Sequence, residues 1–350
     1  MIKKNFTKTL LGFFMIFLIV LLIFIYQDEC KNGVVNGILV SGNVIIPSLL
    51  PFTVCVFMLI KCGITQYIEK IENLVSKIFG LNSSEFLVFL LSFIGGYPIG
   101  AKLLDEMVKD KNSTPKRANK ILMYSINGGP AFIVLAVGNG ILNSKTIGTV
   151  LLLSHIISSL LISVSLAPFL KKVQYKSKPI CHQKSLAENF VESVANASAT
   201  ILNICAFVII FSAFGEILNG IKTMEPITYF LEITNTIRKT KNIYFISFLL
   251  GFGGISVWWQ VLSCCKSFKV NVIAIIVSRI ITGALNTIFT YIIVNIFKFE
   301  FDTLSNNIPS MPSYVYKTPS LTVALIMMVI LLIISLERKF DSGNLKKDLV

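Results

Sequence analysis

Charged residues divide the chain into long apolar runs, and few polar side chains interrupt these runs. A helix needs about 20 mainly apolar residues to cross the hydrocarbon core of a bilayer, and most of the runs are long enough. The uncharged runs lie between Lys8 and Asp28, Lys31 and Lys61, Lys120 and Lys145, Lys145 and Lys171, Glu192 and Glu216, Lys241 and Lys266, and Lys317 and Glu337. The pattern predicts an all-α polytopic membrane protein.

Two apolar segments carry glycine clusters near their middle. One lies between Glu85 and Lys102 and contains Gly95-Gly96-Tyr97-Pro98-Ile99-Gly100, and the other, residues 242–265, contains Gly251–Ser256. A helix broken at membrane depth exposes backbone N–H and C=O groups, which is tolerated only where protein or a watery cavity covers them. We expect both segments to be re-entrant hairpins. The alternative is two ordinary spans with glycine at helix contacts.

The charges of the loops predict which side each segment faces. Residues 61–82 and 109–120 are both basic, as expected if the first hairpin starts and ends on the cytoplasmic side. In the second half, a hairpin at 242–265 leaves Arg338 and Lys339 outside, whereas a span there brings them to the cytoplasm. The charge rule thus favours a span, but an internal repeat favours a hairpin, and we expect the hairpin.

The repeat consists of matching features in the two halves of the chain. Gly95-Gly96 matches Gly253-Gly254, and each half runs from a span through an amphipathic helix and a glycine-broken segment to a long span. With two hairpins, the first half starts outside and the second inside. This is an inverted-topology repeat, in which broken helices meet near the midplane and hold a substrate.

This organisation divides the chain into seven segments. They are an N-terminal membrane anchor (1–30), a first repeat (31–170), a basic cytoplasmic linker (171–188), a second repeat (189–298), a loop (299–319), a C-terminal transmembrane helix (320–336) and a polar tail (337–350). The basic start of the anchor resembles a secretory signal, but no small-residue cleavage site follows it, so we expect it to stay uncleaved.

Composition agrees with a membrane protein. Hydrophobic residues make up 54% of the chain and charged residues 14%, where about 25% charged is usual for a soluble domain. The net charge of +14 indicates cytoplasmic loops before it indicates nucleic acid. The seven cysteines form no CxxC pair, only two histidines are present, and the usual enzyme motifs are absent. We therefore expect no metal, no cofactor, no nucleic-acid partner and no enzymatic activity; the sequence leaves a homo-oligomer open.

Arg279 is a charged residue deep in the apolar stretch 271–297. A guanidinium at that depth costs roughly 2.5–3.5 kcal/mol on insertion scales, so it should face an interior, a partner or a ligand. Its planar fork suits a carboxylate. The alternative is a structural ion pair with Glu232 or Glu216.

Other polar groups accompany the predicted helix breaks. Asn127-Gly128-Gly129-Pro130 interrupts a span, because proline removes a helix hydrogen bond and frees a carbonyl; the alternative is a packing kink. Lys102 either reaches the interface or faces the cavity. The candidate substrate-binding residues are Gly95, Gly96, Tyr97, Lys102, Asn127, Glu232, Asn235, Gly253, Gly254, Ser256, Gln260 and Arg279.

Taken in order, these stretches resemble the YlbJ-type sporulation integral membrane proteins. The resemblance rests on Pro47–Phe52, Gly95–Lys102, Asn127–Phe132, Leu231–Asn235, Gly251–Ser256 and Arg279, which span about residues 33–290. That family carries the nucleoside-recognition, or Gate, domain also found in concentrative nucleoside transporters. The resemblance implies transport of dipicolinic acid across the outer forespore membrane, with the lipid bilayer as the second partner.

Two further function classes stay open. A nucleoside or other small-solute permease would use Glu232, Asn127 and Gln260 to bind ribose and base. A non-transporting membrane scaffold in spore envelope assembly would use none of these residues for a ligand. Uptake of dipicolinate and uridine into proteoliposomes distinguishes the three.

Overall fold

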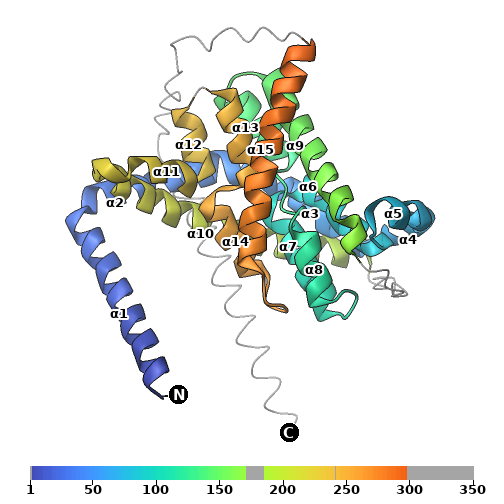
Figure 1. Cartoon of the computed structure of the whole chain (residues 1–350), viewed down its shortest axis with the longest axis horizontal. Helices are drawn as coiled ribbons and strands as arrows, with labels where there is room; N and C mark the ends of the chain where they lie inside the picture. Colours follow the sequence, from blue (N-terminus) through green and yellow to red (C-terminus); the bar gives the residue numbers. More distant parts are fainter. Residues whose placement is uncertain (1, 171–184, 241, 298–350) are drawn as a thin grey trace. The chain divides into compact units, whose positions relative to one another are not determined.

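The computed structural model describes residues 2–170, 185–240 and 242–297, and the regular structure in these ranges is helical (Figure 1). The helices are α1 (Ile2–Ile25), α2 (Gln27–Val40), η1 (Ser41–Ile45), α3 (Ile46–Lys61), α4 (Thr65–Glu69), α5 (Glu72–Phe79), α6 (Ser83–Gly95), α7 (Tyr97–Lys109), α8 (Pro115–Leu122), η2 (Ala131–Ile141), α9 (Lys145–Leu166), η3 (Ala167–Phe169), α10 (Leu186–Gly220), η4 (Lys222–Met224), α11 (Glu225–Leu231), α12 (Ile233–Lys239), α13 (Ile243–Phe252), α14 (Gly254–Cys264) and α15 (Val272–Phe297).

The predicted all-α polytopic membrane architecture is confirmed. Within the described ranges, five helical stretches are long and apolar enough to cross a membrane: Gln27–Lys61, Lys145–Phe169, Leu186–Gly220, Ile243–Cys264 and Val272–Phe297. Many large apolar side chains on these stretches stay exposed, such as Ile273 at 76% and Tyr291 at 59%. Lipid covers such surfaces without penalty. The expected segments 299–319, 320–336 and 337–350, and most of the linker 171–188, lie outside the described residues.

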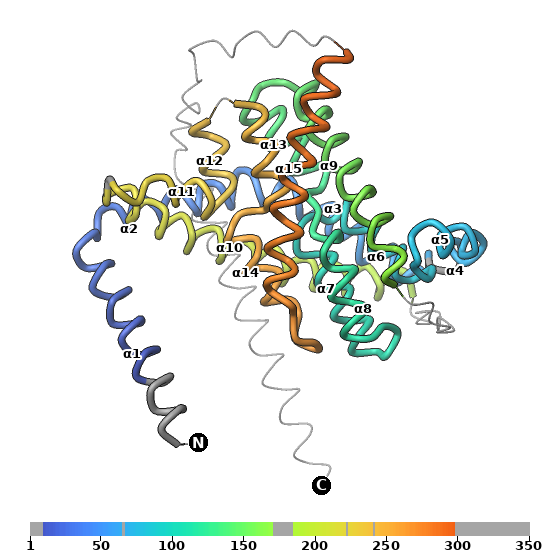
Figure 2. The backbone as a smooth tube through the Cα atoms, viewed as in Figure 1, coloured from blue at the N-terminus to red at the C-terminus, as the bar shows by residue number. Residues whose placement is uncertain are grey.

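Small residues let the long helices pack closely. The α2–η1–α3 stretch packs along α10, and α15 packs against both α9 and α13 (Figure 2). A Cβ added at Gly33 would lie 2.6 Å from the Cα of Ala213 on α10, and one added at Gly251 would lie 2.7 Å from the Cα of Gly283 on α15. These glycines serve helix contacts, as is typical of membrane bundles. The alternative that we gave for the glycine clusters thus holds for Gly251.

The first expected hairpin is present. Helices α6 and α7 meet at Gly96, whose φ of 88° favours glycine. At the open end of the hairpin, Arg117 Nε and Nη2 donate to the two Glu85 carboxylate oxygens at 2.5 and 2.6 Å. The Ser113 hydroxyl also donates to Glu85, at 3.1 Å. The start of α6 therefore lies beside the residues that follow α7, as a hairpin requires.

The second glycine-broken segment differs from our expectation. Helices α13 and α14 are separated at Gly253, with φ of 88°, but they continue in one direction (Figure 1). Together they form the candidate span Ile243–Cys264 in place of a hairpin. The reason lies in packing: α13 lies against α15, while α14 leaves α15 and packs against α7 and α10. The charge rule, which favoured a span here, was the better guide.

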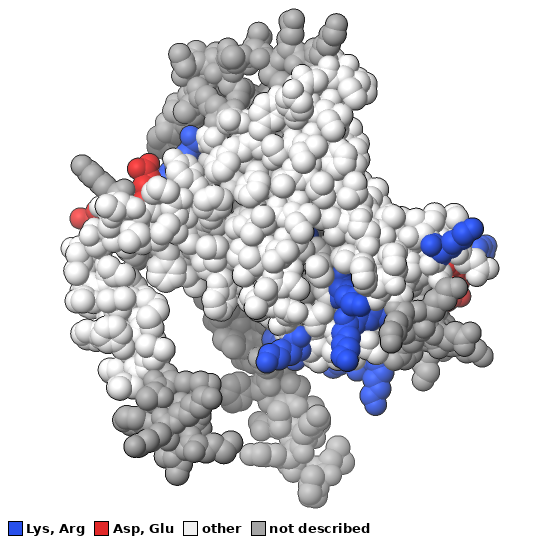
Figure 3. Space-filling model, viewed as in Figure 1, with Lys and Arg blue, Asp and Glu red and all other residues white. Residues whose placement is uncertain are grey.

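Hydrogen bonds between residues that are far apart in the sequence bring several loops to one end of the molecule. Lys120 Nζ donates to the Phe169 carbonyl at the end of the α9 stretch, at 2.5 Å. The Asn119 side chain donates to the Lys269 carbonyl at 3.0 Å and accepts the Asn271 N–H at 2.7 Å. Figure 3 shows Lys and Arg gathered over α7, α8 and the α14–α15 loop. The positive-inside rule assigns this end to the cytoplasm.

This topology predicts the outcome of cysteine labelling. On a cysteine-free background, Lys111→Cys and Lys269→Cys should react with an impermeant maleimide from the cytoplasmic side. Asn143→Cys, in the exposed turn between η2 and α9, should react from the opposite side. Labelling of Lys111→Cys and Lys269→Cys from opposite sides would show that 243–264 does not span.

The buried Glu85–Arg117 pair predicts a double-mutant result. The Glu85 side chain is fully buried and that of Arg117 is 8% exposed, so removing one partner leaves an uncompensated buried charge. Such a loss costs about 3–5 kcal/mol. Glu85→Gln or Arg117→Met alone should lower the thermal unfolding midpoint in detergent strongly, and the double variant should recover part of the loss. An equal fall in the unfolding midpoint for the single variants and the double variant would show that the two charges do not compensate each other.

Candidate functional site

The centre of the described structure is the break between α8 and η2, residues 123–130. Tyr124, Ser125, Ile126 and Asn127 are all fully buried there. The predicted interruption at Asn127–Pro130 is confirmed and is wider than expected. The backbone of residues 125–129 is not helical, so its N–H and C=O groups need partners from other elements, because lipid offers none.

The tip of the α6–α7 hairpin packs directly on this break. A Cβ added at Gly129 would lie 3.0 Å from the Ile94 carbonyl and 3.3 Å from the Gly96 nitrogen. A Cβ added at Gly100 would lie only 2.0 Å from the Ser125 carbonyl oxygen. Backbone therefore touches backbone at two points, which only glycine permits.

Tyr97 joins the hairpin tip to the second half of the chain. Its hydroxyl donates to the Leu250 carbonyl on α13 at 2.9 Å. Its ring meets that of Phe132 edge-on, with centroids 6.0 Å apart. The residue is 7% exposed, so this contact is part of the interior.

Arg279 reaches the same break from α15 and is fully buried. Its Nη1 donates to the Ile126 carbonyl at 2.6 Å and its Nη2 to the Met123 carbonyl at 2.5 Å. Among the described residues it forms no ion pair with Glu232 or Glu216, the structural alternative that we considered. Instead its positive charge stabilises the carbonyl oxygens that the break leaves free.

Several polar atoms around the break have no hydrogen-bond partner within the described residues. They are Tyr124 Oη, Ser125 Oγ, Asn127 Oδ1 and Arg279 Nε. The Asn127 amide nitrogen, by contrast, donates to Ser92 Oγ at 2.8 Å and to the Tyr124 carbonyl at 2.9 Å. Buried polar groups are nearly always paired, so unpaired ones along this break indicate that a ligand or water completes their hydrogen bonds. We call these four residues the central cluster.

A buried polar network on α9 supports the break, and the sequence analysis missed it. His155 Nε2 accepts the Gly128 N–H at 3.0 Å, and its ring also contacts the Asn286 amide on α15. The Ser159 hydroxyl donates to the Tyr124 carbonyl at 2.7 Å. The available signal was the helical spacing of Ser154, His155, Ser158, Ser159 and Ser163, which places polar groups on one face of an apolar span.

A second break lies between α11 and α12, at Glu232. We expected one amphipathic helix here, but Glu232 has extended backbone (φ −137°, ψ 119°) and its carboxylate caps α12 by accepting the Asn235 N–H at 2.8 Å. Glu232 is 6% exposed and forms no ion pair within the described ranges. A capping side chain competes with helix continuation, which explains the break.

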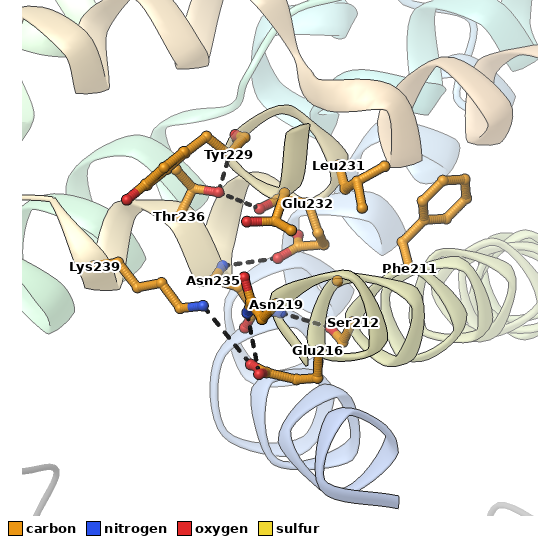
Figure 4. A pocket seen from close by; sticks show the side chains of 12 residues that line it. Phe211, Ser212, Glu216, Asn219, Tyr229, Leu231, Glu232, Asn235, Thr236 and Lys239 are labelled. Carbon is orange, nitrogen blue, oxygen red and sulfur yellow. Dashed lines mark hydrogen bonds and ion pairs between the residues drawn. The ribbon is translucent and has the colours of Figure 1, made fainter. Parts of the chain in front are cut away.

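Glu232 lines a pocket between α10 and the α11–α12 corner (Figure 4). Its polar lining is Ser212, Glu216, Asn219, Thr228, Tyr229, Glu232, Asn235, Thr236 and Lys239. The empty space measures about 300 Å³, including the part open to the surroundings. Of the predicted site residues, the structure therefore brings Glu232 and Asn235 together here and not at the central cluster.

The remaining predicted residues lie in separate places. Gly254 lies against the Glu232 corner, since a Cβ there would be 3.0 Å from Ile233 Cγ1. Gln260 donates to Ser256 one turn away on α14, at 3.3 Å. Lys102 donates to Thr200 on α10 at 2.8 Å and lies 4.6 Å from the centre of the Phe57 ring, so it ties α7 to α10 and α3.

The described residues contain no group of three or more His, Cys, Asp or Glu side chains arranged to hold a metal ion. The chain is similar to the sporulation integral membrane protein YlbJ of Bacillus subtilis (strain 168). The two are 22% identical over 309 residues, which cover 74% of this chain and 76% of that protein. No family model matches the chain, and no solved structure matches it at a significant level. The relationship to a Gate domain and to nucleoside transporters stays a prediction.

The close contact at Gly100 predicts a sharp effect of a single methyl group. Gly100→Ala should displace the Ser125 carbonyl and open the central cluster, lowering the unfolding midpoint by several degrees, as a loss of about 1–3 kcal/mol implies. Gly42→Ala is the control, because a Cβ there meets nothing within 4 Å. Equal unfolding midpoints for the two variants would show that the backbone at Ser125 shifts to accommodate the methyl group at little cost in stability.

Proposed function

We propose that this chain is a transporter that moves a small organic anion across a membrane during sporulation, with dipicolinic acid as the first candidate. The sporulation role is carried over from the distant relative, whose printed name gives a sporulation integral membrane protein. The transport role rests on the architecture: broken helices that meet inside a multi-pass bundle and expose backbone groups there.

The observation that carries the anion is the charge of Arg279. The guanidinium is fully buried and has no carboxylate partner within the described residues, so its positive charge is not neutralised by a side chain. Carbonyl oxygens accept two of its N–H groups, and Nε has no partner in the part of the chain that the structure describes. An uncompensated buried charge is costly, and an anionic ligand would offset that cost.

The amino-terminal ends of two helices add positive charge to this region. Helix α7 begins at Tyr97, beside the break, and η2 begins directly after it at Ala131. The amino-terminal end of a helix carries unpaired N–H groups and partial positive charge, both of which favour an anion. Two such ends and one guanidinium thus support a negatively charged cargo.

Dipicolinate suits this environment chemically. It is a planar dianion with an aromatic ring, and it needs cationic or N–H donors at its edge and an apolar or aromatic wall along its face. Tyr97 and Phe132 supply aromatic rings beside the break. Ser125 Oγ supplies a further group able to donate.

The central cluster is closed in this structure, because its residues are fully buried. Loading therefore requires the hairpin tip at Gly96 to separate from Gly129. Tyr97 and Gly100 hold that tip by a hydrogen bond and by backbone contact, so both contacts would change during transport. Alternating access would then come from gating of the hairpin tip against the rest of the bundle.

A nucleoside cargo has less support. We expected Glu232, Asn127 and Gln260 to bind it jointly, but they lie on different breaks and helices. The Asn127 amide nitrogen and the Gln260 amide already donate to protein groups. A scaffold role predicts no cargo at all and is decided by the same experiment.

The test is uptake of labelled dipicolinate into proteoliposomes that hold only this protein, with uridine as the competing cargo. Arg279→Lys should retain the charge but lose the fork, and Arg279→Gln should lose both. A charge-assisted contact is worth roughly 1.5–3 kcal/mol, so the apparent affinity should fall by about ten- to a hundred-fold in Arg279→Gln.

Arg238→Gln is the charge-matched control, because Arg238 is exposed on α12. Near-normal dipicolinate uptake by Arg279→Gln would leave Arg279 a structural residue. Uptake of uridine but not dipicolinate would select the permease, and uptake of neither would favour the scaffold.

A further inference from the structure

Helices α4 and α5 lie at the level where the membrane segments end. α4 follows the candidate span Gln27–Lys61 after a short turn. Beyond α5, a Cβ added at Gly80 would lie 2.8 Å from the carbonyl oxygen of Ala167, close to the end of the candidate span Lys145–Phe169. The chain then enters the first hairpin at Ser83. Both ends of the α4–α5 pair are therefore held at the boundary of the membrane region.

The direction of α5 follows from its angle to α6. The two helices are apolar enough to form one broken span, but they meet at a bend of 74°. α6 runs inward to the hairpin tip at Gly96, which packs against Gly129 in the buried break. Because α5 turns sharply away from this inward direction at the boundary, it lies along the membrane surface and does not cross the membrane.

One face of the pair packs on the rest of the protein. Ile68 on α4 and Val75 on α5 are buried. α4 packs against α6, and α5 packs against α6 and α9. The ring of Phe79, the last residue of α5, lies 5.3 Å from that of Phe86 on α6, measured between centroids. These contacts fix which side of the pair faces away from the bundle.

A second apolar face of the pair is exposed. It consists of Tyr67, Ile71, Leu74 and Ile78, and we call it the apolar stripe. The exposed fractions of its members run from 42% at Ile78 to 70% at Tyr67. Their spacing of four, three and four residues places them on one side of a helix. A contiguous exposed apolar surface of this kind indicates an interaction site.

The polar side chains form a third face. Lys70, Asn73 and Lys77 are exposed, and helical spacing places them opposite the buried Ile68 and Val75. Basic side chains are visible near α4 and α5 at the edge of the molecule (Figure 3). The apolar stripe lies between the buried face and the polar face. A helix beside a bundle at a membrane surface requires this order, because its three sides meet protein, lipid and water.

The charges of the segment do not select a particular lipid head group. Residues 65–79 contain Glu69, Lys70, Glu72 and Lys77, so their formal charges sum to zero. An interfacial helix binds by burying apolar area, and anionic lipids add attraction when the helix carries a net positive charge. The apolar stripe therefore fits the boundary between head groups and acyl chains in zwitterionic and anionic bilayers alike.

We propose that α4 and α5 form an interfacial helix pair that inserts the apolar stripe into the cytoplasmic leaflet, with the phospholipid bilayer itself as the partner. The basic residues around the open end of the first hairpin assign this side to the cytoplasm. The pair is joined to that hairpin, because Glu72 accepts the Ser83 hydroxyl at 3.0 Å and the Gly80 carbonyl accepts Arg117 Nη2 at 2.5 Å. The inference goes beyond the proposed transport and involves no cargo.

The test uses the full-length protein on a cysteine-free background, in nanodiscs of phosphatidylcholine. Leu74→Cys carries an NBD fluorophore on the apolar stripe, and Asn73→Cys carries it on the polar face as the matched control. We expect lipids with a nitroxide near the top of the acyl chain to quench the probe at position 74, and aqueous iodide to quench the probe at position 73.

Two outcomes of this measurement would overturn the proposal. Quenching of position 74 by iodide and not by lipid would place the apolar stripe in water. Shielding of position 74 from both quenchers would mean that protein, such as a second copy of the chain, covers the stripe. Replacing part of the phosphatidylcholine by phosphatidylglycerol should leave the quenching unchanged, and lipid quenching that requires the anionic lipid would refute docking by apolar burial.

A charge placed in the apolar stripe tests the cause of insertion. With the probe at Ile78→Cys, Leu74→Asp should abolish quenching by lipid, because a carboxylate is costly among acyl chains. Asn73→Asp, with the same added charge on the polar face, should keep it. The unfolding midpoint of each variant in detergent shows that it is folded. Lipid quenching that persists in folded Leu74→Asp would contradict insertion of the stripe.

Discussion

Backbone polar groups that are freed inside a bilayer must find partners within the protein, and the interior of this molecule is built around that requirement. The break at residues 123–130 is satisfied by side chains from two helices: Arg279 on α15, and His155 and Ser159 on α9. The hairpin tip at Gly96 packs against Gly129 in the same break. A change in any of these elements therefore alters the same buried backbone.

The two breaks that concern function have opposite chemistry. At the central cluster, an unneutralised guanidinium and two helix amino-termini make the surroundings positive. At the α11–α12 corner, Glu232 and Glu216 outnumber Lys239 and make them negative. The two breaks therefore differ in charge, and they are held on different helices.

Part of this arrangement could be predicted because it depends on local sequence. The spans follow from uncharged runs, and the breaks at Gly96, Asn127–Pro130 and Gly253 follow from glycine and proline, whose backbone preferences act whatever surrounds them. The free-energy cost of exposing the Arg279 guanidinium to lipid correctly predicted that this side chain lies in the protein interior.

Only the tertiary structure decided what these features contact. The glycine break at Gly253 is compatible with a hairpin or a span, and the packing of α13 on α15 and of α14 on α7 selected the span. Arg279 met carbonyls 153 and 156 positions away, and Tyr97 met one 153 away. Such pairings depend on which helices become neighbours. Charge and glycine content determine where a helix crosses or breaks, whereas its partners are set by the packing of the whole bundle.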